Sequence, residues 1–153
     1  MNSNIIDLKI YAAILLLSTL GLTLPIPMRV EANGSIIYVP DDYSTIQMAI
    51  GNATAGDTII VRSGFTNGGA ITVDKQLTIQ GEDRENTIID GSGEFLAVYI
   101  TVDDVHISGF TIHNAVRGIT IFSSDNVVVR NSTIHGCGGD GVWVSNSDNS
   151  TIE

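Results

Sequence analysis

The chain has 153 residues, of which 17 are acidic and 7 are basic, so its formal net charge at pH 7 is −10. This charge, and the absence of clustered Lys and Arg in the sequence, argue against a protein that binds nucleic acid or an anionic lipid surface. Cys137 is the single cysteine, which excludes an internal disulfide and leaves core packing to supply the stability.

The first 32 residues are predicted to be a signal peptide. Lys9 lies in a short polar segment, and residues 10–24 form an apolar run that ends before a proline. Residues 30–32 then place small or branched side chains where a signal peptidase reads the chain. The alternative is an uncleaved anchor, but the run is short for a membrane span. We therefore expect a mature domain of residues 33–153 that is secreted, periplasmic or exposed on the cell surface.

A short amphipathic helix is predicted near residues 44–51. Ser44 and Gln47 have the spacing of a capping box, in which each side chain binds a free N–H group of the first turn. The apolar residues that recur at helical spacing are Ile46, Ala49 and Ile50. Because a solenoid exposes its interior at each end, we expect this helix to close the N-terminal end, within a cap of residues 36–56.

Short β-branched runs follow the cap, and Gly, Asp, Asn or Lys turn residues separate them. Each run has the length of one strand, and together they supply about two coils of a solenoid. The runs are residues 58–61, 70–73, 77–81, 86–91 and 97–102.

The last third of the chain repeats itself. Residues 103–115 align with residues 125–137 at a step of 22, and residues 118–126 align with residues 141–149 at a step of 23. A further copy begins at Ser150. A period in the low twenties without helical periodicity predicts a parallel β-helix in which one repeat forms one coil.

The alternation of side chains predicts how the coils stack. Ile119 and Ile121 face the interior while Thr120 faces outward, and Trp143 takes the outward position in the next coil. Asn126 and Asn149 fall at equivalent bends, where they can form a hydrogen-bonded ladder. The residues expected to be buried are Val105, Ile107, Ile112, Ile119, Ile121, Val127, Val129, Ile134, Val142 and Val144.

Two segments carry a family resemblance. IIYVPDDYSTIQMAIGNATAGDTIIV and LTIQGEDRENTIIDG resemble the cap and first coils of the pectin-lyase-like superfamily, in its NosD-like periplasmic copper-binding and archaeal surface-protein group. ISGFTIHNAVRGITI and VRNSTIHGCGGDGVWV resemble the coil repeats of that group. The resemblance implies a right-handed parallel β-helix whose coils occupy residues 57–153. Since members of the group carry further coils, it also implies an incomplete C-terminal end, through which we expect self-association.

The predicted function is structural, adhesive or carbohydrate-binding, without catalysis, and the expected partners are polysaccharides or other components of the cell envelope. Two alternatives stay open. One is a polysaccharide lyase or glycoside hydrolase, and the other is an accessory factor in periplasmic copper handling. The superfamily includes enzymes and non-catalytic binders alike, so the fold does not decide between them.

Three groups of residues are candidates for these functions. Asp140, with Arg117 and Arg130, is the candidate for sugar cleavage, for which lyases often add calcium. His113 and His135 stack in adjacent coils near Cys137 and are candidate ligands of copper or zinc, or else an inert ladder. Trp143 and Tyr99 face outward and are candidates for stacking on a sugar ring. The other aspartates lie in turns, where the turn geometry explains them: Asp90, Asp103, Asp104, Asp125 and Asp148.

Overall fold

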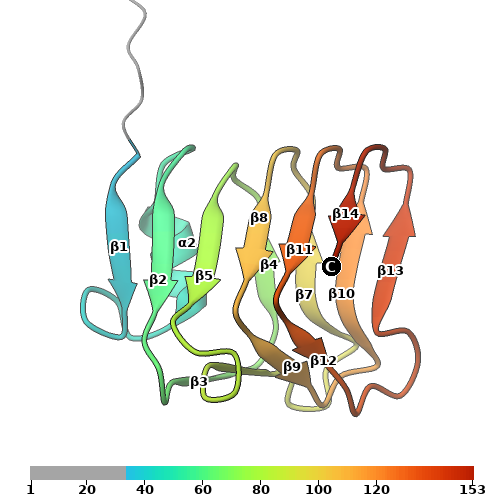
Figure 1. Cartoon of the computed structure of the whole chain (residues 1–153), viewed down its shortest axis with the longest axis horizontal. Coiled ribbons are helices and arrows are strands. Elements are labelled where there is room, and N and C mark those ends of the chain that lie inside the picture. Colours follow the sequence, from blue (N-terminus) through green and yellow to red (C-terminus); the bar gives the residue numbers. More distant parts are fainter. Residues whose placement is uncertain (1–33) are drawn as a thin grey trace, which may run out of the picture. The chain divides into compact units, whose positions relative to one another are not determined.

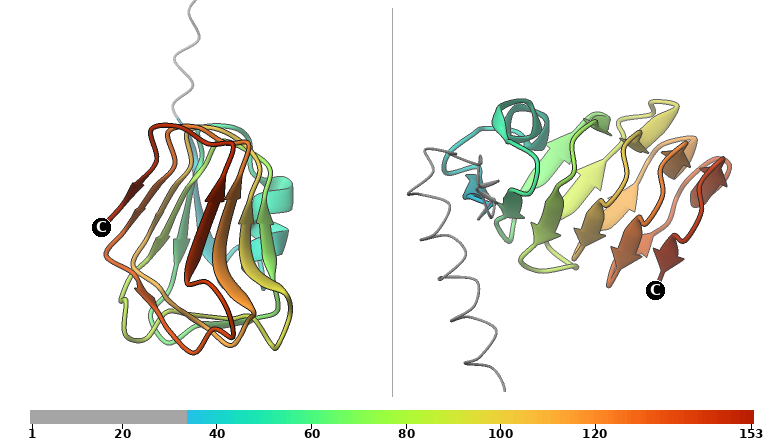
Figure 2. Two further views of the ribbon diagram at one scale, coloured as in Figure 1. Left: turned by 90° about the vertical axis from the view of Figure 1, so that its right-hand side faces the viewer. Right: turned by 90° about the horizontal axis from the view of Figure 1, so that it is seen from above.

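The computed structural model describes residues 34–153. The predicted signal peptide lies outside these residues. Within these residues, fourteen strands pair in parallel and wind into a solenoid of about five turns (Figure 1). Seen along the solenoid axis, the strands of successive coils lie over one another and enclose the core (Figure 2). Among the described residues, no helix is long and apolar enough to cross a membrane.

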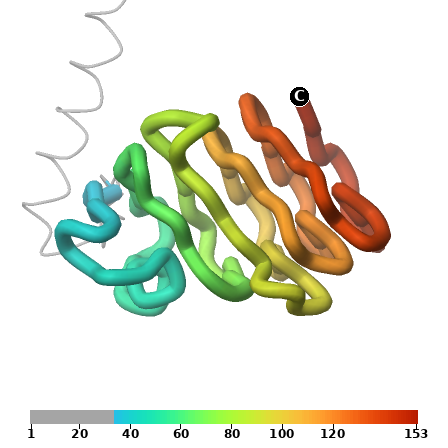
Figure 3. The backbone as a smooth tube through the Cα atoms, turned by 90° about the horizontal axis from the view of Figure 1, so that it is seen from below, coloured from blue at the N-terminus to red at the C-terminus, as the bar shows by residue number. Residues whose placement is uncertain are grey.

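Each coil contributes strands to three sheets. Sheet A contains six strands in the order β1 (Ile36–Val39), β2 (Thr58–Val61), β5 (Thr78–Gly81), β8 (His106–Ser108), β11 (Val128–Arg130) and β14 (Thr151–Ile152). Sheet B contains β3 (Thr66–Gly68), β6 (Ile88–Asp90), β9 (Thr111–His113) and β12 (Thr133–Ile134). Sheet C contains β4 (Ile71–Val73), β7 (Leu96–Ile100), β10 (Arg117–Phe122) and β13 (Val142–Ser145). Figure 3 shows the successive coils following nearly the same path.

The predicted registers of the last two coils are confirmed. Ile112 pairs with Ile134 between β9 and β12, and Ile119 pairs with Val142 between β10 and β13. The interior is a set of aliphatic ladders, one of which runs through Ile59, Ile79, Ile107 and Val129 of sheet A. Each fully buried Ile contributes about 1.5–3 kcal/mol relative to an exposed one, so these ladders are the main source of stability.

Most of the predicted core is buried, but Val144 is not. Its exposed fraction is 42%, and Ile134 and Val142 are only partly buried. The reason is position, because β12 and β13 are the outermost strands of sheets B and C. The correctly predicted buried residues are Val105, Ile107, Ile112, Ile119, Ile121, Val127 and Val129.

The capping helix forms, although its first residue differs from the prediction. Helix α2 spans Ile46–Asn52, and its N-cap is Thr45, whose side chain accepts a hydrogen bond from the Met48 N–H. The capping box expected between Ser44 and Gln47 is therefore wrong. Gln47 instead binds the edge of sheet C: its Oε1 accepts from the Thr72 N–H at 2.7 Å, and its Nε2 donates to the Thr72 carbonyl at 3.3 Å. A single amide thus occupies the place of a neighbouring strand beside β4.

The other end of α2 is fixed by a lysine. Lys75 Nζ donates to the carbonyl oxygens of Ile50, Gly51 and Ala53 at 2.8–2.9 Å. These carbonyls lack partners within the helix, and a cation at a helix C-terminus is favourable. The apolar face of α2 is buried against the core, as predicted, through Ile46, Ala49 and Ile50.

A polar ladder holds one bend of the last coils together. Asn149 Nδ2 donates to Asn126 Oδ1 at 2.9 Å, and Asn126 Nδ2 donates to Asp104 Oδ1 at 3.1 Å. All three residues have a positive φ of 57–58°. Beside them, the Asp103 and Asp125 carboxylates accept the backbone N–H groups of the following coil at 2.7–2.8 Å. The interpretation of these aspartates as turn residues agrees with this geometry.

Asp57 ties the first coil to the second and makes stability depend on pH. The buried carboxylate accepts the backbone N–H groups of Thr54 and Ser35 at 2.8 and 2.7 Å. These bonds hold the pKa of Asp57 below its usual value. A lowered pKa in the folded state stabilises the fold above pH 4, and this contribution is lost as pH falls further.

We therefore expect Asp57→Asn to flatten the loss of stability below about pH 4, and to lower stability at pH 7 by about 1–2 kcal/mol. Urea unfolding at a series of pH values measures both effects. Asp74→Asn, in an exposed loop, is the control for the loss of one charge. A pH profile for Asp57→Asn that parallels the wild type would contradict this assignment.

Candidate functional site

The outer face of sheet C carries a row of aromatic and hydroxyl side chains. In register across the sheet, Thr72 of β4 is followed by Tyr99 of β7, Thr120 of β10 and Trp143 of β13. Their inward neighbours, Ile71 among them, form the core, so strand alternation points this row outward. The structure thus places both predicted sugar-stacking residues on one face, with one residue between them.

Arg117 lies beside this row between two aromatic rings. Its guanidinium carbon is 4.4 Å from the centre of the Trp143 ring and 5.3 Å from that of the Phe95 ring. Its Nε forms an ion pair with Asp140 Oδ2 at 3.4 Å, and the side chains are 26% and 56% exposed. An arginine stacked on aromatic rings keeps its N–H groups in the plane of the guanidinium, where a ligand can accept them.

Thr120 is the buried member of the row. Its exposed fraction is 3%, although it faces outward, because Tyr99 and Trp143 lie on its two sides. Its Oγ1 has no hydrogen-bond partner within residues 34–153. At the edges of the same face, Phe95 is 58% and Phe122 is 38% exposed. The aromatic face, defined as Phe95, Tyr99, Arg117, Thr120, Phe122 and Trp143, therefore combines apolar area with hydrogen-bonding groups.

Arg130 does not belong to this site. It is the last residue of β11 and pairs with Ser108 in sheet A, whereas Arg117 begins β10 in sheet C. The structure brings Asp140 to Arg117 and leaves Arg130 on another face. A catalytic role for these residues stays the alternative hypothesis that the sequence left open.

The two histidines stack as the repeat predicts. The rings of His113 and His135 have centroids 5.4 Å apart and an interplanar angle of 25°. The thiol of Cys137 lies 3.7 Å from the carbonyl oxygen of His135, the partner to which it donates. In the part of the chain that the structure describes, no group of three or more His, Cys, Asp or Glu side chains is arranged to hold a metal ion. Copper or zinc binding by His113, His135 and Cys137 and an inert histidine ladder both stay open as hypotheses.

Asp90 is next to the histidines in sheet B, where it pairs in register with His113. Its carboxylate accepts from the Ser92 N–H at 2.7 Å and from Asn114 Nδ2 at 2.8 Å. These two bonds, more than the charge of His113, hold the pKa of Asp90 below its usual value. Asp90 is thus a charged residue at the end of β6, and its hydrogen bonds join it to the following turn and to Asn114 of the next coil.

The family follows from the sequence of the coils. Residues 52–153 match the family described as "Right handed beta helix region". The chain belongs to this family. The predicted handedness of the β-helix is confirmed, while membership of the NosD-like group stays a prediction. No curated protein matches the chain.

Two solved structures share the fold of this β-helix protein. A pectin methylesterase in complex with a hexasaccharide has a TM-score of 0.59 and 16% identity, over 75% of this chain and 46% of that chain. An alginate lyase from Paenibacillus sp. str. FPU-7 has a TM-score of 0.52 and 21% identity, over 74% of this chain and 44% of that chain. This β-helix protein spans less than half the length of either, and at these identities the likeness establishes the fold alone.

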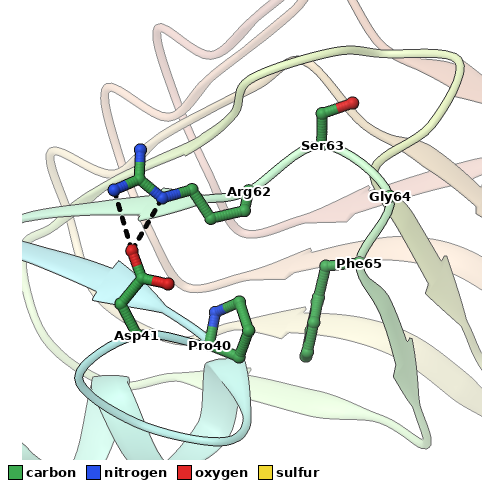
Figure 4. Close-up of a pocket in the computed structure, with 6 residues that line it drawn as sticks. All are labelled: Pro40, Asp41, Arg62, Ser63, Gly64 and Phe65. Atoms are coloured by element: carbon green, nitrogen blue, oxygen red, sulfur yellow. Dashed lines mark hydrogen bonds and ion pairs between the residues drawn. The ribbon is translucent and has the colours of Figure 1, made fainter.

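A pocket of the β-helix protein lies near its capped end. The pocket has a volume of about 290 Å³. Figure 4 shows the residues that line it: Pro40, Asp41, Arg62, Ser63, Gly64 and Phe65. Arg62 donates to Asp41 at 2.8 Å and to Glu82 at 2.6 Å, and it stacks on Tyr38 at 4.2 Å. Arg62 in turn lowers the pKa of Glu82. The two charged residues that line this pocket, Asp41 and Arg62, therefore already form an ion pair, which joins the end of β2 to the loop after β1.

Three residues of the aromatic face were not among the predicted site residues: Phe95, Thr120 and Phe122. Phe95 precedes β7 in a Gly-Glu-Phe turn, and no repeat aligned it with Arg117. Thr120 was predicted to face outward, but not to be buried. Phe95 could have been found from its position directly before β7, since Arg117 begins β10 of the same sheet. Residues at equivalent strand ends of adjacent coils lie close together.

Proposed function

We propose that this β-helix protein binds polysaccharide on the aromatic face of sheet C, without cleaving it. The observation that carries the proposal is Arg117 held between Phe95 and Trp143, beside outward Tyr99. Aromatic rings stack on the C–H faces of sugars, and a fixed guanidinium donates hydrogen bonds to sugar hydroxyls and carboxylates. Parallel strands present such groups on an extended, fairly flat surface, which suits a polymer.

The geometry around Asp140 favours binding over catalysis. A carboxyl group that acts as a general acid is usually buried or faces a second carboxylate. Asp140 has its side chain 56% exposed, and its partner is the cation Arg117. Asp140 lies next to the aromatic face, where its ion pair orients the Arg117 side chain.

The cellular location is part of the proposal. The predicted signal peptide in residues 1–32 supports export of this protein, and the acidic composition suits a soluble domain that meets envelope polysaccharide. A secreted, periplasmic or cell-surface protein would find its polymer there.

Binding is best measured by isothermal titration calorimetry with three probes: cellohexaose, xylohexaose and hexagalacturonate. We expect at least one of them to bind, and Arg117→Ala to weaken that binding about tenfold or more, which corresponds to about 1.4 kcal/mol. Arg130→Ala is the matched control, because it removes the same charge from sheet A, and its affinity should equal that of the wild type.

Two outcomes would contradict the proposal. Equal weakening by Arg117→Ala and Arg130→Ala would show a general charge effect in place of a site on sheet C. Unsaturated products or new reducing ends, lost in Asp140→Asn, would establish an enzyme. The incubation is made with and without calcium, so that a calcium-dependent lyase would be detected.

A further inference from the structure

We propose that the Thr120 hydroxyl is the polar contact of a sugar subsite that Trp143 covers when the subsite is empty. The inference rests on the proposed function and names one residue and one movement within it. The ligand group is a hydroxyl of a pyranose ring, which neutral sugars and uronates share.

The Thr120 hydroxyl is buried and has no hydrogen-bond partner among the described residues. Thr120 is 97% buried by its neighbours, since its exposed fraction is 3%. A buried hydroxyl without a hydrogen bond destabilises a fold, whereas valine has the same shape without that cost. Retaining a hydroxyl at this position is therefore explained if a ligand supplies the missing partner.

Trp143 is the neighbour of Thr120 whose side chain can move aside. Tyr99 lies on β7 and Trp143 lies on β13, on the two sides of β10. Trp143 is only partly buried and contacts Arg117, which a largely exposed carboxylate holds at 3.4 Å. Exposed ion pairs and single cation–π contacts are weak. Displacement of the Trp143 ring is therefore the accessible way to uncover Thr120.

The groups around Thr120 are complementary to a pyranose ring. Once Trp143 swings aside, the exposed site holds the Thr120 hydroxyl, the Tyr99 ring next to it and the Arg117 guanidinium beyond. A pyranose ring has a C–H face to stack on an aromatic ring and hydroxyls at its edge that both donate and accept. The Thr120 hydroxyl can satisfy either role, which fits a sugar better than a purely apolar ligand.

The test compares Thr120→Val with Thr120→Ser. We expect Thr120→Val to melt a few degrees higher than the wild type, because it removes an unpaired hydroxyl. The same variant should bind the best of cellohexaose, xylohexaose and hexagalacturonate about tenfold more weakly. Thr120→Ser retains the hydroxyl, and its affinity should stay within about threefold of the wild type. A higher melting temperature combined with weaker binding is a result that a merely structural threonine would not give.

Fluorescence reports the movement directly, because Trp143 is the only tryptophan of the chain. Addition of the bound hexasaccharide should shift its emission and change its quenching by acrylamide. Three results would overturn the inference: Thr120→Val binding as tightly as the wild type, Thr120→Val melting lower, or binding that leaves the Trp143 emission unchanged. A wild-type chain that binds none of the three hexasaccharides would overturn the proposed function itself.

Discussion

Ile121→Asp is expected to unfold the β-helix. Ile121 is fully buried, and it stacks between Ile100 of the preceding coil and Val144 of the following one. An aspartate there would place an unpaired charge in an aliphatic ladder, at a cost of several kcal/mol. A cost of this size is comparable to the total free energy of unfolding, because folded domains are only about 5–15 kcal/mol more stable than the unfolded chain.

Circular dichroism and urea unfolding measure this effect. Phe122→Asp is the matched control, since the adjacent side chain faces outward and is 38% exposed. We expect the control to stay folded and to lose no more than about 1 kcal/mol. Equal tolerance of both substitutions would mean that the assignment of inward and outward residues in β10 is incorrect.

Gly81→Ala is expected to be the second strongly destabilising change. Gly81 ends β5, and a Cβ atom at this position would overlap the carbonyl oxygen of Gly109 in the next coil and approach Thr87 Cβ to 3.0 Å. The backbone groups of two coils would have to move apart, which we expect to cost about 2–4 kcal/mol. The change would be seen as a lower midpoint of urea unfolding.

Gly51→Ala provides the opposite control. Gly51 lies within α2, and a Cβ atom there would have no neighbour within 4 Å. Alanine is the better helix former by about 0.8–1.0 kcal/mol, so this variant should be more stable than the wild type. If both alanine variants were destabilised alike, close approach of the coils would not be the reason for the glycine at position 81.

The repeat predicts the fold of this protein better at its end than at its start. Between β10 and β13 the step is 23 residues, so the pairing of Thr120 with Trp143 could be read from the sequence. Between β4 and β7 the connection is longer. The pairing of Thr72 with Tyr99 therefore does not follow the step of 22 or 23 residues and could not be read from the sequence. Strand β3 was missed altogether, since Thr66–Gly68 contains an asparagine and a glycine that disfavour strands.

The asparagine in β3 has a reason that only packing reveals. Asn67 is buried, and its Oδ1 accepts from the Ile46 N–H of α2 at 3.3 Å while its Nδ2 donates to the Gly69 carbonyl at 3.0 Å. It occupies the position that Ile89 takes in the next coil. A polar residue in an apolar ladder is thus explained by the start of the helix above it, a contact between distant segments that no local pattern contains.

The candidate site was predicted in parts. Tyr99 and Trp143 were identified because aromatic residues at outward positions are visible in the alternation. The stacking of Arg117 and the burial of Thr120 depend on side-chain conformations, which strand periodicity does not determine. The chemistry of single residues was therefore predictable, and their convergence was not.

The ladder of Asp104, Asn126 and Asn149 gives the bend a polarity. An amide can donate or accept on either side of a coil, so a column of asparagines alone has two equivalent orientations. A carboxylate only accepts. Asp104 at the N-terminal end of the column therefore forces Asn126 to present its NH₂ group backward and its oxygen forward, and Asn149 follows the same orientation. One charged residue thus selects the direction of both amides that stack above it.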